Sequence, residues 1–139
     1  MRAKARELTL KLLFQMDLTG QTFEEVLSLA RSNIKANEAV WELAEEKLRG
    51  IVENLSQIDD VIKDFTKKWG EIERLTYIDR NILRIATYEF LHEPETPTGV
   101  VIAEAVRLAE LYGTENSARF VNGVLSSMAK NLRKNGANT

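Results

Sequence analysis

Apolar side chains recur along this chain at intervals of three and four residues, a spacing that is typical of helices with one buried face. The first stripe covers Arg2–Leu18, and Gly20 just after it favours a helix stop. Thr22, with Glu25 three residues later, forms a capping-box pattern before the second stripe, and Asn37 is a good N-cap for the third. No stretch alternates apolar and polar residues for long enough to indicate a strand. The pattern predicts an all-α protein.

The later part of the chain continues the helical pattern through four more segments. We expect Ser56 to cap a fourth helix and Thr76 to cap the most apolar helix of the chain. Both prolines lie within residues 92–99, which therefore predict a loop. Val100–Tyr112 then predicts a helix ended by a glycine, and we expect Thr114 to cap the last helix. The pattern thus predicts about seven helices.

The helical pattern breaks once, near Trp69 and Gly70, and no Pro-rich or Gly/Ser-rich linker follows. The break divides the chain into helical halves of about residues 1–70 and 71–139. Small helical halves of this size bury their apolar faces by packing together. We therefore expect one domain over residues 1–139, made of two small packed bundles. The spacing leaves open whether Trp69 lies in the core or at an interface.

The chain offers few groups for catalysis or metal binding. It contains no cysteine and a single histidine, His92, which excludes thiol nucleophiles, disulfides, iron–sulfur clusters and cysteine-type zinc sites. No phosphate-binding glycine loop is present. Adjacent acids such as Asp59 and Asp60 point about 100° apart on a helix, so we expect them to face solvent. We predict no catalytic residue, no cofactor and no metal site, and a binding role by elimination.

Size and composition are those of a folded globular protein. The 139 residues are 44% apolar and 29% charged, which disfavours disorder. No run of 18 uncharged residues occurs, and the first residues lack the apolar stretch of a signal peptide. We therefore expect no membrane span and a cytoplasmic location.

Charge is distributed unevenly along the chain, although the formal net charge is only −2. Residues 2–11 carry four basic side chains and one acid, and residues 119–139 carry four basic side chains and no acid. Residues 23–60 carry nine acids and four bases. The two basic ends can present one surface to RNA only if the fold brings them together. The alternative is that the terminal cations simply keep the chain ends solvated.

Two segments carry cations or aromatics that folding alone does not explain. Arg2, Lys4 and Arg6 oppose the helix macrodipole at the start of the first helix. Arg2 and Arg6 lie four residues apart and share a face that suits two phosphates of one strand. Arg119 beside Phe120 combines a phosphate contact with an aromatic ring on which an RNA base can stack. The alternatives are a frayed, solvated terminus for the first segment and a core position for Phe120.

Four segments, in this order, are similar to a known family. They are Arg6–Gln15, Asp79–Glu89, Ala103–Ala109 and Phe120–Leu125. Any one of them alone is a generic amphipathic helix, but the ordered set resembles the NusB family of transcription antitermination factors across nearly the whole chain. The resemblance implies an all-helical fold of two three-helix bundles.

The resemblance also implies a function without catalysis. NusB-like proteins bind the boxA element of nascent ribosomal RNA, chiefly as a heterodimer with NusE, which is also a protein of the small ribosomal subunit. They then join NusA, NusG and RNA polymerase in an antitermination complex. One alternative is a helical protein–protein adaptor that binds no RNA. Another is the related fold of RNA cytosine methyltransferases, which the absence of a cysteine nucleophile disfavours.

Carried onto this sequence, the resemblance implies two sets of site residues. The expected RNA contacts are Arg2, Lys4, Arg6, Asn116, Arg119 and Phe120. The expected NusE contacts are Phe14, Glu73 and Asp79. Asp79 can pair with a basic NusE side chain, or it can serve a capping box with Thr76. Ala3 and Ala5 interrupt the denser arginine run that the family often carries, so we expect strong RNA binding to require NusE.

Overall fold

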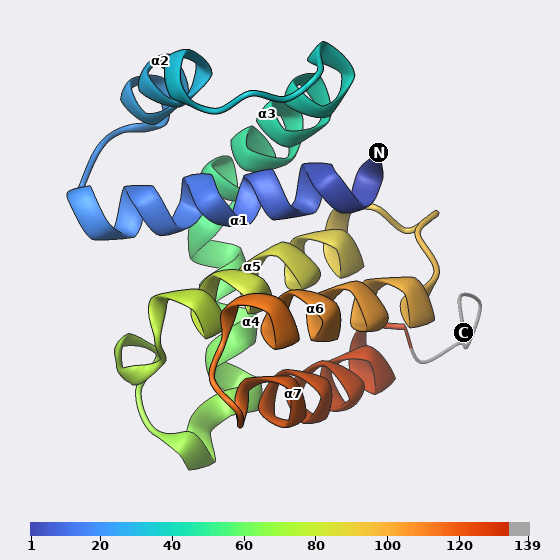
Figure 1. Cartoon of the computed structure of the whole chain (residues 1–139). Coiled ribbons are helices and arrows are strands. Elements are labelled where there is room, and N and C mark those ends of the chain that lie inside the picture. The colour runs from blue at the N-terminus through green and yellow to red at the C-terminus, as the bar shows by residue number, and fades with distance from the viewer. Residues whose placement is uncertain (134–139) are drawn as a thin grey trace.

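Seven helices and two short 3-10 turns account for most of residues 1–133, the part of the chain that the computed structural model describes (Figure 1). No strand occurs within these residues, so the all-α prediction is confirmed. The helices are α1 (Arg2–Thr19), α2 (Phe23–Asn33), α3 (Glu38–Glu53), α4 (Leu55–Thr66), α5 (Tyr77–His92), α6 (Thr98–Tyr112) and α7 (Ser117–Leu132). The 3-10 turns cover Lys67–Trp69 and Ile72–Arg74, between α4 and α5.

Three of the predicted helix starts are confirmed by local side-chain bonds. The Thr22 hydroxyl accepts a hydrogen bond from the amide of Glu25 at 3.1 Å, and the Glu25 carboxylate accepts one from the amide of Thr22 at 2.9 Å. Asn37 caps α3 through a bond of 2.9 Å. The Thr76 hydroxyl caps α5 by accepting from the amide of Asp79 at 3.1 Å. Each bond joins residues three positions apart, so both partners can be recognised from the local sequence.

Two predicted caps are wrong. α4 begins at Leu55 because Asn54 both ends α3 and starts α4, which leaves Ser56 inside the helix. α7 begins at Ser117, whose hydroxyl accepts a hydrogen bond from the amide of Thr114 at 2.9 Å. Thr114 therefore lies in the turn before α7 and does not cap it.

The helices form two packed groups with α5 at the centre (Figure 1). α1, α2 and α3 pack together as one group, and α1 also packs along α5. α4 packs against α5 and α7, so the second group holds the four helices α4 to α7. The two-bundle arrangement is confirmed, but the second bundle has four helices where three were expected. The change between the groups falls at Asn54, although the sequence pattern breaks at Trp69.

A buried carboxylate joins three of these helices. Glu89 of α5 is 1% exposed and accepts two hydrogen bonds from the Arg6 guanidinium of α1, from Nε at 2.9 Å and from Nη2 at 2.7 Å. The Lys47 ammonium of α3 lies 3.1 Å from a Glu89 oxygen and 3.1 Å from the Glu93 carboxylate. A buried carboxylate stays charged only when it is paired, so these contacts hold α1 and α3 against α5.

A second ion cluster joins α4 and α1 to α5. Arg84 of α5 donates to the two carboxylate oxygens of Asp59 at 2.8 Å each, and its Nη1 lies 3.3 Å from Asp17 of α1. The expectation that Asp59 faces solvent is therefore wrong, because its carboxylate neutralises the buried Arg84 guanidinium. Periodicity could not reveal this pairing, since the two residues lie on different helices.

Replacing Arg6 with alanine should destabilise the fold. The change leaves Glu89 buried with Lys47 as its only close cation, and removing one partner of a buried pair costs about 3 kcal/mol or more. Urea denaturation measures the loss. Arg31→Ala is the matched control, because Arg31 forms exposed pairs with Glu38 and Glu45 that solvent screens. Equal stability of the Arg6→Ala variant and the parent would contradict a structural role for Arg6.

The stability of the fold should depend on pH through the buried carboxylate of Glu89. Burial acts to raise the pKa of Glu89, but the hydrogen bonds from Arg6 and the charges of Lys47 and Arg6 outweigh it, so the pKa lies below its ordinary value of 4.5. The stabilisation is therefore complete above that value and is lost as the pH falls through the lower pKa of the folded state.

Urea midpoints measured between about pH 7 and about pH 3 test this linkage. Glu89→Gln should be less stable than the parent at neutral pH, and the difference between the two proteins should shrink as the pH falls. Parallel stability curves for the two proteins would rule out Glu89 as the titrating group.

Candidate nucleic-acid interface

The first turn of α1 carries exposed cations and no acid. Arg2 and Lys4 are both exposed, and Met1, the N-cap, provides no side-chain cap. The positive end of the helix dipole adds to their charge. Because folding alone favours acids at this position, the arrangement suits an anionic ligand.

Arg6 lies one turn further along α1 but does not join this exposed group. Its side chain is 5% exposed, it binds Glu89 through two hydrogen bonds, and its Nη1 lies 3.7 Å from the Glu104 carboxylate. A phosphate would have to displace a buried carboxylate to reach the guanidinium. This corrects the expectation that Arg6 contacts a phosphate beside Arg2. Arg6 instead positions the start of α1.

Two further lysines lie near Lys4. Lys11 of α1 and Lys35, in the connection between α2 and α3, line with Lys4 a shallow hollow of about 260 Å³. All three are exposed, and none forms an ion pair with another residue of the described part of the chain. The sequence did not single out Lys35, because it lies within the acidic stretch. We call Arg2, Lys4, Lys11 and Lys35 the N-terminal cluster.

The second predicted segment lies at the start of α7. Asn116, the N-cap residue, and Arg119 in the first turn are both exposed. Phe120 is half-buried and packs in part against the core. Its ring also meets the ring of Trp69 edge to face, with centroids 5.2 Å apart and planes at 83°. Phe120 therefore combines a core contact with a contact at the surface.

Trp69 is a surface residue that the sequence left undecided. Its indole is 45% exposed on the 3-10 turn Lys67–Trp69, and the Lys68 ammonium lies 4.5 Å from the centroid of the ring. Gly70 follows with a φ of 102°, a conformation that favours glycine and ends the turn. We call Lys68, Trp69, Asn116, Arg119 and Phe120 the aromatic cluster.

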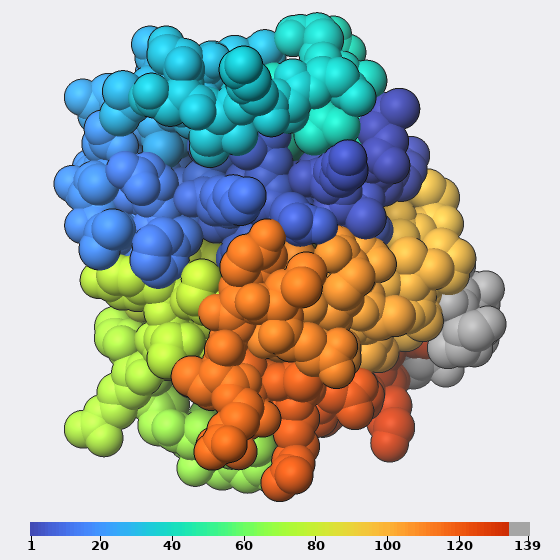
Figure 2. Space-filling model, in the orientation of Figure 1, coloured from blue at the N-terminus to red at the C-terminus, as the bar shows by residue number. Residues whose placement is uncertain are grey.

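The N-terminal cluster lies on the first bundle, and the aromatic cluster lies on the second bundle at the start of α7. Arg133 donates hydrogen bonds to the backbone carbonyls of Glu89 and Glu93, both at 3.0 Å, so the end of α7 and the start of α1 meet at the end of α5. The aromatic cluster lies at the other end of α7, a helix of 16 residues that is about 24 Å long. α6 lies between α1 and α7 (Figures 1 and 2). The fold brings the start of α1 and the end of α7 near each other but separates the predicted RNA residues into two patches. Lys134 lies outside the described residues.

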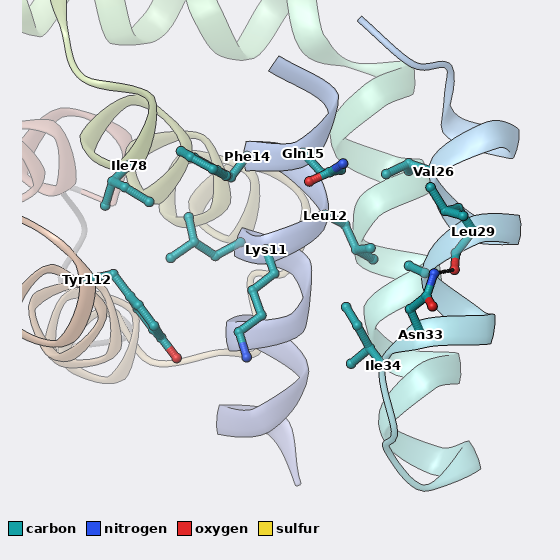
Figure 3. Close-up of a pocket in the computed structure, with 12 residues that line it drawn as sticks. Lys11, Leu12, Phe14, Gln15, Val26, Leu29, Asn33, Ile34, Ile78 and Tyr112 are labelled. Atoms are coloured by element: carbon teal, nitrogen blue, oxygen red, sulfur yellow. Dashed lines mark hydrogen bonds between the residues drawn. The ribbon is translucent and has the colours of Figure 1, made fainter. Parts of the chain in front are cut away.

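The residues predicted to contact a protein partner lie where α1 meets the start of α5. The Phe14 ring packs edge to face on Tyr77, with centroids 6.1 Å apart, and Tyr77 is 39% exposed. Phe14 also lines an apolar groove of about 460 Å³ between α1 and α2, where Ile78 and Tyr112 lie on the same side as Phe14 (Figure 3). This surface offers aromatic and aliphatic side chains to a partner.

Two acids adjoin this apolar surface. Glu73 is exposed in the second 3-10 turn, and Asp79 is half-buried in the first turn of α5. Thr76 accepts from the amide of Asp79, but one carboxylate oxygen of Asp79, Oδ1, has no hydrogen-bond donor within residues 1–133. This oxygen is enclosed by its own chain, so a basic group of a partner can meet only the accessible part of the half-buried carboxylate.

The described residues contain no group of three or more histidine, aspartate or glutamate side chains placed to hold a metal ion. His92 is exposed, and its Nε2 lies 2.9 Å from the side-chain oxygen of Gln57. None of the helices in residues 1–133 is both long and apolar enough to cross a membrane.

An all-helical chain with two exposed cationic clusters and an apolar surface flanked by acids has the features of a binding protein. Residues 3–130 match the model of the NusB family, and the chain belongs to that family. The resemblance seen in the sequence is therefore confirmed. The relatives described next are transcription antitermination proteins, so the chain is an antitermination factor and not an enzyme.

Relatives of this chain align with it over nearly its whole length. The transcription antitermination protein NusB of Thermotoga maritima is 44% identical over 129 residues, which are 93% of this chain and 90% of the relative. That of Dehalococcoides mccartyi is 42% identical over 131 residues, which are 94% of this chain and 91% of the relative. These identities extend across both helical bundles.

Solved structures give the same result for the fold. T. maritima NusB superposes with a TM-score of 0.83 at 40% identity, covering 94% of this chain and 91% of that chain. A crystal structure of the antitermination factors NusB and NusE in complex with dsRNA superposes with a TM-score of 0.79 at 32% identity, covering 94% of this chain and 96% of that chain. The chain therefore has the NusB fold.

Proposed function

We propose that this chain is an antitermination factor that binds the boxA element of nascent ribosomal RNA together with NusE. One observation carries the proposal: exposed cations stand at the starts of α1 and α7 in a chain that aligns over 94% of its length with NusB in a complex with NusE and dsRNA. The resulting complex joins NusA, NusG and RNA polymerase in the cytoplasm, where the RNA is made.

Cations and one aromatic ring make the RNA contacts. Arg2 and Lys4 bind backbone phosphates at the positive end of α1, and Arg119 binds a phosphate at the start of α7. Phe120, half-buried beside Arg119, offers a ring on which a base stacks. The Asn116 side chain makes no capping hydrogen bond to α7, so it is available to a base edge or a phosphate. RNA that reaches both clusters passes over α6 (Figure 2).

NusE binds the surface formed by α1 and the start of α5. Phe14 supplies the apolar contact, and the exposed carboxylate of Glu73 supplies negative charge beside it. Asp79, which is half-buried, pairs with a basic NusE side chain. The residues proposed to contact NusE, which are Phe14, Glu73 and Asp79, are different from those proposed to contact RNA.

Fluorescence anisotropy of labelled boxA RNA, with a scrambled RNA as control, tests the proposal. We expect selective boxA binding that tightens when equimolar NusE is added. Phosphate contacts by Arg2, Lys4 and Arg119 should make log K fall with log salt at a slope of about 2, at about 0.7 for each contact to a single strand. Equal affinity for the two RNAs, with and without NusE, would favour a helical adaptor that binds only proteins.

Single variants in the same assay separate the surfaces. Lys4→Ala and Arg119→Ala should each weaken binding and reduce the slope by about 0.7. Arg49→Ala, which removes an exposed cation of α3, should change neither quantity. Phe14→Ala should abolish the gain from NusE while leaving the affinity of the protein alone unchanged. If Arg49→Ala weakens binding as much as Lys4→Ala, overall charge and not these sites controls the affinity.

A further inference from the structure

Trp69 is the more exposed of the two tryptophans of the chain. The indole has 45% of its surface open to solvent, whereas Trp41, the other tryptophan of the chain, is 3% exposed in the core. A single exposed aromatic side chain is common on protein surfaces, so the groups around the indole decide what it can bind.

The indole is held in place from two sides. Phe120 of α7 contacts it edge to face at 5.2 Å, and Phe120 is itself anchored by partial packing against the core. Gly70, with a φ of 102°, ends the turn directly after Trp69, and its amide donates to the carbonyl of Lys67 at 3.1 Å. A ring whose position is set by the fold binds a flat ligand with little loss of freedom.

Cations flank this ring pair. The Lys68 ammonium lies 4.5 Å from the centroid of the Trp69 ring, and Arg119, beside Phe120, is exposed. Lys67 makes only a long exposed contact with Asp64, at 4.0 Å. Aromatic rings with cations around them are the combination that binds unpaired bases and the phosphates between them. Apart from Phe120, the residues beside the indole are Lys67, Lys68 and Gly70, which are exposed and not apolar, so this surface suits a charged ligand better than an apolar protein partner.

We propose that Trp69 is a second stacking surface for an unpaired RNA base, next to Phe120, and that Lys68 leaves the indole to bind the adjoining phosphate. The base takes the place of the ammonium on the ring, so one exposed cation–π contact is exchanged for a stacking contact and a phosphate contact. The inference rests on the proposed function and adds the turn between α4 and α5 to its RNA surface.

Anisotropy with the full chain, NusE and labelled boxA RNA tests the inference. Trp69→Ala should raise Kd by about tenfold, within the range of roughly 5- to 100-fold that stacking on an aromatic ring supports. Trp69→Phe should fall between this variant and the parent because a smaller ring remains. Arg49→Ala, which removes an exposed side chain of α3, is the control and should leave Kd unchanged.

An RNA series with one abasic nucleotide moved along the sequence identifies the stacked base. At one position the missing base should weaken binding to the parent but not to Trp69→Ala, since both changes remove the same contact. RNA should also quench the tryptophan fluorescence of the parent much more than that of Trp69→Phe, in which only the buried Trp41 remains. The fluorescence test needs only the conservative variant, so it holds even if Trp69→Ala folds poorly.

The outcomes distinguish this inference from the function on which it rests. If the parent binds boxA RNA and Trp69→Ala binds it equally well with the same sensitivity to abasic nucleotides, Trp69 is no stacking surface and the proposed function stands. If Trp69→Ala instead loses affinity for NusE in the absence of RNA, the turn binds protein and the inference is overturned. If the parent shows no preference for boxA under any condition, the proposed function fails and this inference fails with it.

Discussion

The buried charge of Glu89 is the constraint on which the rest of the structure depends. A carboxylate with 1% of its surface exposed needs cations close to it, and Arg6 of α1 and Lys47 of α3 provide them. Arg133, after α7, binds the backbone carbonyls of the same end of α5. One short segment of α5 therefore fixes the start of α1, the middle of α3 and the end of α7. Because the start of α1 is anchored in this way, the positions of the exposed Arg2 and Lys4 are fixed relative to α5.

The arginines and lysines of the chain fall into two classes, those that pair with buried acids and those that are exposed to solvent. Arg6 and Arg84 are buried and neutralise acids of the core, whereas Lys4 and Arg119 are exposed. The formal net charge of −2 hides this division, because it counts both classes alike. Two small exposed groups, one on the first bundle and one at the start of α7, suit an extended strand of RNA better than a compact anion. The separate apolar and acidic surface around Phe14 leaves room for a protein partner on the same molecule.

Local features of this fold could be predicted from the sequence, and distant ones could not. The caps at Thr22, Asn37 and Thr76 were predictable because each bond joins residues three apart. Ser56 and Thr114 have the same chemistry as caps, but Asn54 and Asn116, two residues away in each case, are the N-cap residues of α4 and α7. Burial of Arg6 was unpredictable because its partner lies 83 positions away. The environment of Trp69 was equally unpredictable, since the ring that it contacts, Phe120, lies on another helix far along the chain. Spacing showed which residues were chemically suited to bind RNA, and only the fold showed which of them are free to do so.

Backbone chemical-shift mapping of the isotope-labelled protein, titrated with unlabelled NusE and boxA RNA, tests the central claim most directly. The claim is that RNA reaches both exposed clusters while the buried ion pairs stay intact. The account predicts RNA-dependent shifts at the start of α1, in the turn around Trp69 and at the start of α7, with NusE-dependent shifts around Phe14 and Asp79. Shifts on adding RNA that are confined to the acidic helices α2 and α3, or that are absent from both clusters, would contradict it.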